Sequence, residues 1–252
     1  MTRAEAAVRR RARRRSRLWV PALLAAVLAA AWLWPDAPQQ PPAGHIPQQL
    51  LDLAERNPEA RTFVYDYPEQ HDACHAIDLT AEASSETVPL LLQWDERWGY
   101  GRYAGDFFAL TGCGPTCLSM AALYLTGDDR WSPAAVGQYA AGGGYAVDGS
   151  GTAWALFSEG VAPLGLSSRE LPLDGGTVRD ALDGGELVAC VVGPGDFTTT
   201  GHFLLLTGWT DGGVALNDPN SRGNTEALWP WETLSGQIRG LWALGARTTE
   251  GD

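Results

Sequence analysis

The chain has 252 residues with 30 acidic residues, 18 arginines and no lysine, and its net charge is −12. Eight arginines lie within residues 1–17, so the remainder carries 29 acidic residues against 10 arginines, a net of −19. This acidic body excludes nucleic acid as an expected partner because like charges repel. The length allows one globular domain and an appendage.

The first predicted element is an apolar run over residues 18–34, which carries no charge and directly follows the basic residues 1–17. At 1.5 Å per residue it covers about 25 Å, against about 30 Å for a bilayer core. Trp19, Trp32 and Trp34 lie near its two ends, as interfacial aromatic residues do. We expect a transmembrane signal anchor with a cytoplasmic N-terminus and an extracellular body. The alternative is a cleaved signal peptide, which would release the body.

Three further segments follow in chain order. Residues 35–45 are a Pro-rich linker without a fold of their own. Residues 46–86 begin with a short amphipathic helix, expected to pack on the outside of the domain, and continue as an arm with few periodic signals. Residues 87–252 alternate helices and short strands, which indicates an α+β domain.

Within this domain, Cys113 stands at the predicted start of a helix. Pro115 suits the first helical turn, and Gly127 can end the helix. The helix N-terminus favours the thiolate, because its free N–H groups carry partial positive charge. Gly112 and Gly114 let the backbone turn tightly beside the sulfur and leave it uncovered.

A hairpin is predicted further along the chain. Residues 202–209 read as a buried strand that opens with His202, residues 210–213 as a turn, and residues 214–218 as a second strand that ends at Asp218. The hairpin returns Asp218 to the neighbourhood of His202. We expect the carboxylate to hold the Nδ1–H of the imidazole and to leave Nε2 facing the thiol. Asn217 points to the other face of the strand, so only one of the two neighbours can meet the histidine.

The order Cys113, His202, Asp218 predicts a cysteine nucleophile with a histidine base and an orienting carboxylate. Cys117 and Cys190 are interpreted as small buried packing residues, and the alternative is a disulfide between one of them and Cys74. The short cluster of residues 71–75 has no distant partner with metal-ligand spacing. No metal and no cofactor is therefore expected.

Several longer stretches carry a resemblance to a known family. The chain resembles the bacteriocin-processing (double-glycine leader peptidase) like family of papain-fold cysteine peptidases, and more closely a branch of extracellular bacterial members. The matching stretches are Leu51 to Tyr67, Gln93 to Tyr100, Gly112 to Met120, Gly151 to Trp154, Gly193 to Thr198, Gly201 to Phe203 and Asn217 to Ser221.

The resemblance implies an α+β papain-like cysteine peptidase fold over residues 87–252. It makes Cys113 the nucleophile, His202 the general base and acid, Asp218 the residue that orients the histidine, and Gln93 the oxyanion donor. In the leader peptidases the glutamine lies one or two helical turns before the cysteine, whereas Gln93 lies 20 residues before it. Residues 94–112 would therefore have to loop out and return Cys113 beside Gln93.

Two more residues are expected at the substrate cleft by the same resemblance, Trp154 and Gly201. Trp154 belongs to the motif Gly151-Thr152-Ala153-Trp154, and its alternative role is that of a core aromatic residue. Gly201 immediately precedes His202, after a loop of three threonines that sets the histidine at the cleft edge.

The function expected from these features is cleavage of peptide or isopeptide bonds in a peptide or protein substrate, by an exported cysteine peptidase at the cell membrane. One alternative keeps the triad for acyl transfer, as in transglutaminase-like proteins or peptidoglycan amidases. The other alternative is a catalytically silent binding module that has kept the fold.

Overall fold

A computed structural model describes residues 44–247 of the chain. These residues belong to one compact unit. The predicted basic N-terminus, the apolar run 18–34 and most of the linker 35–45 lie outside the described residues. Within residues 44–247, none of the helices has the length and apolar character needed to span a bilayer.

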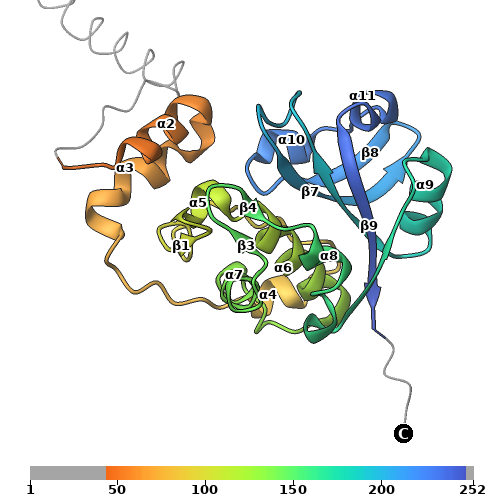
Figure 1. Cartoon of the computed structure of the whole chain (residues 1–252), viewed down its shortest axis with the longest axis horizontal. Coiled ribbons are helices and arrows are strands. Elements are labelled where there is room, and N and C mark those ends of the chain that lie inside the picture. The colour runs from red at the N-terminus through yellow and green to blue at the C-terminus, as the bar shows by residue number, and fades with distance from the viewer. Residues whose placement is uncertain (1–43, 248–252) are drawn as a thin grey trace, which may run out of the picture. The chain divides into compact units, whose positions relative to one another are not determined.

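The described chain is a mixed α+β structure, as predicted. Its sheet has five antiparallel strands in the order β5-β9-β6-β7-β8. Figure 1 shows this sheet, with α9, α10 and α11, beside a group of helices that surrounds α6. The strands are β5 (Leu166–Glu170), β6 (Leu187–Val192), β7 (His202–Thr210), β8 (Gly213–Asn217) and β9 (Ile238–Ala246).

The central strand β6 shows how the sheet is held between two cores. All six of its residues are buried, as expected of a strand covered on both faces. Successive side chains of a strand point to opposite faces. Ala189 and Val191 accordingly join the core on the α6 side, whereas Val188 and Val192 join the core on the side of α9 and α11.

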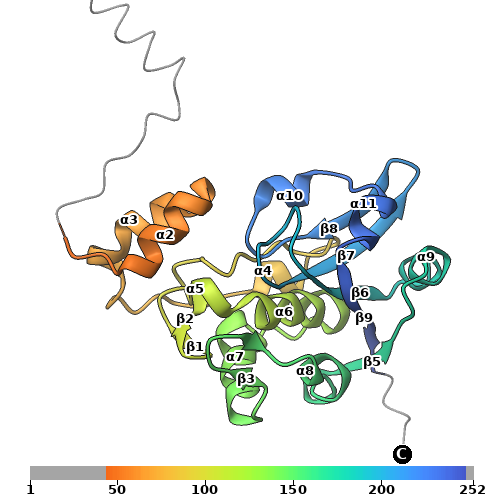
Figure 2. The ribbon, with the colours of Figure 1, turned by 45° about the horizontal axis from the view of Figure 1, so that its top comes forward.

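Helix α6 (Cys113–Thr126) is the centre of the helical half, and Figure 2 shows it between the sheet and α7. The ten residues from Gly114 to Leu123 are all buried. A helix that is apolar on every side has to lie inside the protein, and α6 packs against α7, α4 and β7. The neighbouring helices are α4 (Thr80–Ala83), α5 (Phe108–Thr111), α7 (Pro133–Gly142) and α8 (Ala155–Ser158).

Two local predictions are confirmed almost to the residue. Helix α6 begins at Cys113 with Pro115 in its first turn, and it ends at Gly127, whose φ of 67° is the left-handed conformation that glycine adopts most easily. The hairpin is formed by β7 and β8, which pair antiparallel with Thr210 opposite Gly213.

The N-terminal arm is more ordered than the sequence pattern suggests. It contains α2 (Gln48–Arg56), the short 3-10 helix η1 (Pro58–Ala60) and α3 (Arg61–Gln70). After residue 56, where the sequence shows few periodic signals, the chain forms η1 and α3. Burial decides the fold here, since Leu50, Phe63 and Val64 form a third core with Leu92 and Trp94 of the domain. The arm is therefore part of the domain's packing.

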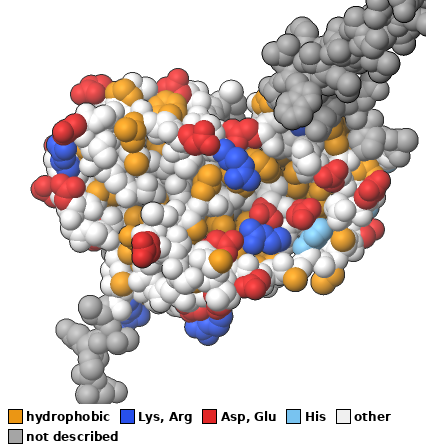
Figure 3. All heavy atoms as spheres, turned by 180° about the vertical axis from the view of Figure 1, so that it is seen from behind, with side chains coloured by type: hydrophobic (Ala, Val, Ile, Leu, Met, Phe, Trp, Pro, Cys, Tyr) orange, Lys and Arg blue, Asp and Glu red, His pale blue; other side chains and the backbone are white. Residues whose placement is uncertain are grey.

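The remaining elements are short. They are the hairpins β1 (Arg102–Tyr103) with β2 (Asp106–Phe107) and β3 (Ala146–Val147) with β4 (Gly151–Thr152), the 3-10 helix η2 (Ala162–Leu164), and the helices α9 (Gly175–Asp183), α10 (Arg222–Glu226) and α11 (Trp231–Ser235). On the face seen in Figure 3, the arginines lie beside acidic side chains rather than in a continuous basic patch. Among the ion pairs of the described residues, Arg97 pairs with Asp95 at 2.9 Å and with Glu82 at 3.5 Å.

Candidate active site

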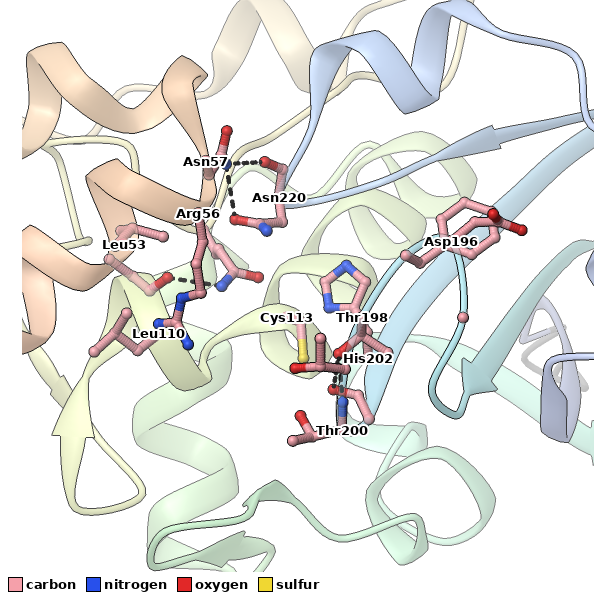
Figure 4. Close-up of a pocket in the computed structure, with 16 residues that line it drawn as sticks. Leu53, Arg56, Asn57, Leu110, Cys113, Asp196, Thr198, Thr200, His202 and Asn220 are labelled. Carbon is pink, nitrogen blue, oxygen red and sulfur yellow. Dashed lines mark hydrogen bonds between the residues drawn. The ribbon is translucent and has the colours of Figure 1, made fainter.

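Cys113 and His202 are brought together because the elements that they begin are packed against each other. Cys113 is the first residue of α6, His202 is the first residue of β7, and α6 packs on β7. Figure 4 shows the two side chains close together at one cavity. The first N–H groups of α6 have no partner within the helix and point toward this end of it.

The histidine ring is held by Asp218, which follows β8 at the end of the hairpin. His202 Nε2 donates to Asp218 Oδ1 at 2.7 Å. The prediction that Asp218 would hold Nδ1 was wrong, because the carboxylate meets the other ring nitrogen. Nδ1 is therefore the nitrogen left for the thiol of Cys113.

Asp218 is almost completely buried, with 1% of its surface exposed. Its carboxylate also accepts hydrogen bonds from the backbone N–H of Asn220 at 2.8 Å and from Asn224 Nδ2 at 2.7 Å. Thr225 Oγ1 accepts from the backbone N–H of Asp218 at 2.9 Å. These bonds hold the carboxylate beside His202.

The charges of the site favour a thiolate beside an imidazolium. Burial raises the pKa of Cys113, but hydrogen bonding and the charge of His202, with the N–H groups of Phe203 and Gly114, lower it more, so the pKa lies below that of a free thiol. For His202, burial lowers the pKa, and the stronger effects of Asp218 and Cys113 raise it to about 10. Both directions stabilise the ion pair over the other protonation states.

The pKa of Asp218 moves in the direction this arrangement requires. Burial raises the pKa, but the positive charge and hydrogen bond of His202 lower it more, with help from Asn224 and Asn220. The carboxylate therefore stays ionised at neutral pH although it is buried. An ionised Asp218 keeps the imidazole protonated.

Gln93 lines the same cavity as Cys113. Residues 94–112 do loop out and return through α5. The side chain is buried, and Nε2 donates to the backbone oxygen of Ala109, in α5, at 2.7 Å. The backbone N–H of Gln93 donates to the backbone oxygen of Pro219, the residue after Asp218, at 2.7 Å. One N–H of Nε2 remains beside that bond, and Oε1 has no hydrogen-bond partner among the described residues.

Two hollows meet at the cysteine. One, of about 450 Å³, is lined by Gln93, Cys113 and His202. The other, of about 350 Å³, is lined by Cys113, His202 and Trp154. Gly201 lines both. The Trp154 side chain is 48% exposed and contacts the Trp242 ring edge-on at 5.8 Å, so it is a cleft residue with one side on the core.

The glycines beside Cys113 are required for packing, which differs from their expected role. A Cβ at Gly114 would lie 2.5 Å from Thr152 Oγ1 in β4, and a Cβ at Gly112 would overlap the Phe108 ring. The φ of Gly112 is −86°, which any residue can adopt. Close approach of neighbouring elements therefore explains both glycines, and the tight turn does not.

The neighbours of the triad have separate tasks. Asn217 turns away from His202 and donates to the backbone oxygen of Pro89 at 2.9 Å, which holds the segment before Gln93. Cys117 and Cys190 are buried free thiols, and Cys74 is an exposed free thiol, so the alternative of a disulfide among them is not realised. In residues 44–247, no group of three or more histidine, cysteine or acidic side chains is arranged for a metal ion.

The sequence reasoning missed a latch between the arm and the loop of residues 218–224. Asn57 Nδ2 donates to the backbone oxygen of Asn220 at 2.6 Å. The Glu59 carboxylate accepts from Ser221 Oγ at 2.7 Å and from the backbone N–H of Arg222 at 2.7 Å, at the start of α10. One indication of it was present in the sequence, because two of the stretches that carry the resemblance, 51–67 and 217–221, contain these residues.

Comparison with known proteins does not assign the chain. No protein-family model matches it, and no curated protein is significantly similar to it.

Proposed function

We propose that this chain is an exported cysteine peptidase-like hydrolase with a papain-like fold, which cleaves peptide or isopeptide bonds through Cys113, His202 and Asp218. The observation that carries the proposal is the buried pair of His202 and Asp218 at 2.7 Å, with the lowered pKa of Cys113 beside it. Burying an ionised carboxylate and a protonated histidine costs desolvation free energy. Such pairs are common at active sites, and here the pair lies beside the Cys113 thiol. The family resemblance of the motifs supports the same assignment.

The reaction begins with the Cys113 thiolate, which attacks the carbonyl carbon of the scissile bond. The negative charge that develops on the carbonyl oxygen is stabilised by the backbone N–H of Cys113, at the start of α6, and by the remaining N–H of Gln93 Nε2. The His202 imidazolium gives its Nδ1 proton to the leaving amine as the C–N bond breaks. A thioester on Cys113 and a free amine result.

Hydrolysis of the thioester returns the site to its starting state. Neutral His202 takes a proton from water, and the resulting hydroxide attacks the thioester carbonyl. The C–S bond breaks, the acid leaves, and Cys113 is again a thiolate beside the imidazolium. Asp218 holds the ring in one orientation through both steps and stays ionised itself.

The activity is tested with the full-length protein on a peptide library, with Cys113→Ala as the control. We expect hydrolysis that disappears in Cys113→Ala while the circular dichroism spectrum stays the same. Amine incorporation in place of hydrolysis would assign the triad to acyl transfer. Equal turnover in the control would overturn the proposal.

The export of the domain is tested separately. By the positive-inside rule we expect the arginines of residues 1–17 to stay in the cytoplasm and the domain to lie outside. A reporter that is active only outside the cytoplasm, fused after Asp252, should then be active. Activity from a cytoplasmic reporter alone would contradict export. A chain with a shortened N-terminus in the medium would show that residues 18–34 are a cleaved signal peptide and not a retained anchor.

A further inference from the structure

The larger hollow beside Cys113 contains one arginine that the triad chemistry does not use. Arg56 is the last residue of α2, and it lines this hollow together with Leu53 and Leu110. Figure 4 shows its side chain extending from α2 toward Leu110, on the wall opposite Asp196. The arm thus contributes a cation to the cavity of the thiol.

The guanidinium of Arg56 is only partly engaged by the protein. Within the described part of the chain it donates one hydrogen bond, from Nε to the backbone oxygen of Asp52 at 3.1 Å. The terminal amino groups are left for a ligand. Asp196, the acidic side chain in the same lining, accepts instead from Gln237 Nε2 at 2.7 Å.

The end of α2, which carries Arg56, is held by the latch. The next residue, Asn57, donates to the backbone oxygen of Asn220 at 2.6 Å, and Glu59 binds the start of α10. The end of α2 is therefore anchored to the loop that carries Asp218. An arginine on an anchored helix end loses less backbone freedom on binding than one on a free helix end.

We propose that Arg56 makes this hollow a subsite for a substrate carboxylate, which names the substrate class of the proposed peptidase and rests on that function. A guanidinium binds a carboxylate through two parallel N–H groups. Leu53 and Leu110 offer apolar contact to the carbon atoms beside that carboxylate. The carboxylate comes either from an acidic side chain near the scissile bond or from the C-terminus of the peptide.

The overall charge of the domain makes this cation necessary for such a substrate. The chain after residue 17 has a net charge of −19, which repels anionic peptides at long range. A local arginine offsets that repulsion at the site itself. Selection of carboxylate-bearing substrates then depends on Arg56 rather than on the general field.

The first test does not require turnover. Cys113 is alkylated with iodoacetate, which is anionic, and with iodoacetamide, which is neutral, in the full-length protein. We expect Arg56→Gln to lower the rate with iodoacetate, relative to the rate with iodoacetamide, by about twofold or more at low salt. Arg56→Lys should keep most of the wild-type ratio of these two rates. Arg130→Gln is the matched control, because Arg130 follows the far end of α6, about 20 Å from Cys113 by helix rise.

The second test uses peptide pairs that differ only in one carboxylate. One set compares glutamate with glutamine inside the peptide, and the other compares a free with an amidated C-terminus. We expect the carboxylate member of one set to be preferred, and Arg56→Gln to reduce its kcat/KM about five- to tenfold through KM. The set that responds identifies the source of the carboxylate.

The outcomes separate this inference from the peptidase proposal. Hydrolysis without a charge preference, or with a preference that persists in Arg56→Gln, overturns the carboxylate subsite and leaves the peptidase intact. If no peptide is cleaved, the ratio of the iodoacetate rate to the iodoacetamide rate alone tests the carboxylate subsite. A ratio unchanged by Arg56→Gln then overturns the subsite, and a lowered ratio supports it without the peptidase.

Discussion

Replacing Asp218 by asparagine tests the electrostatic basis of the site without removing an acceptor for the histidine. Asp218 Oδ1 lies 2.7 Å from His202 Nε2, and against the effect of burial the charge and hydrogen bond of Asp218, together with those of Cys113, raise the pKa of His202 to about 10. The amide oxygen can still accept from Nε2, but the negative charge is lost. We expect Asp218→Asn to lower the pKa of His202 by about 1–3, which corresponds to about 1.4–4 kcal/mol.

The sign of the pH dependence follows from the roles of the two groups. The ion pair exists above the lowered pKa of Cys113 and below the raised pKa of His202. Loss of the Asp218 charge lowers the pKa of His202, so the pH range in which the ion pair exists should lose its alkaline part. Turnover of Asp218→Asn should therefore fall at a lower pH than turnover of the wild type.

The assay is an NMR titration of the histidine rings, which is practicable because the chain has only four histidines. Asn217→Ala is the matched control at the neighbouring position. It removes the hydrogen bond to Pro89 at 2.9 Å and should cost about 1–3 kcal/mol of stability, with the His202 titration unchanged. A wild-type His202 that titrates near its ordinary pKa, or an Asp218→Asn variant that titrates like the wild type, would refute the reasoning.

Three further predictions follow from the same contacts. At about pH 6, iodoacetamide should modify Cys113 before Cys117 or Cys190, since burial raises the pKa of both; equal labelling in mass spectrometry would contradict this. Glu59→Gln should weaken the latch and reduce the free energy of unfolding by about 1–2 kcal/mol. It should also lower kcat, because the latch holds the loop that carries Asp218. A loss of stability with unchanged kcat would show that the latch is purely structural. Gln93→Ala should lower turnover about 10²–10³-fold with alkylation of Cys113 nearly unchanged, and an active variant would place the oxyanion donor elsewhere.

Local sequence signals were sufficient for the elements that carry the triad. The glycine at 127 ends α6 with a positive φ, and the turn residues 210–213 produce the β7–β8 hairpin. Both depend on backbone preferences of a few adjacent residues, which the sequence displays directly. These signals place Cys113 at a helix start and return Asp218 beside His202. The meeting of Cys113 with His202 depends on the packing of α6 on β7, and it was predicted from the order of the three residues and the family resemblance.

Other features depend on packing between distant segments and gave no local signal. Asp218 meets Nε2 of His202, whereas Nδ1 was predicted, because no local pattern reports how a ring is oriented between distant segments. Helix α3 contains Pro68, which argues against a helix, but burial of Phe63 and Val64 outweighs this local preference. The arrival of Arg56 at the cavity follows from the latch between residues 163 positions apart, and no periodic pattern reports it.

The central claim is that Cys113 carries the acyl group of the substrate. It is tested most directly by acid quenching of the full-length protein during turnover of a cleaved peptide, followed by mass mapping of the modified residue. We expect an acyl adduct on Cys113 that forms and then decays as product appears, and neither adduct nor product in Cys113→Ala. Product formed by Cys113→Ala, or an adduct on a different residue that keeps pace with turnover, would contradict it.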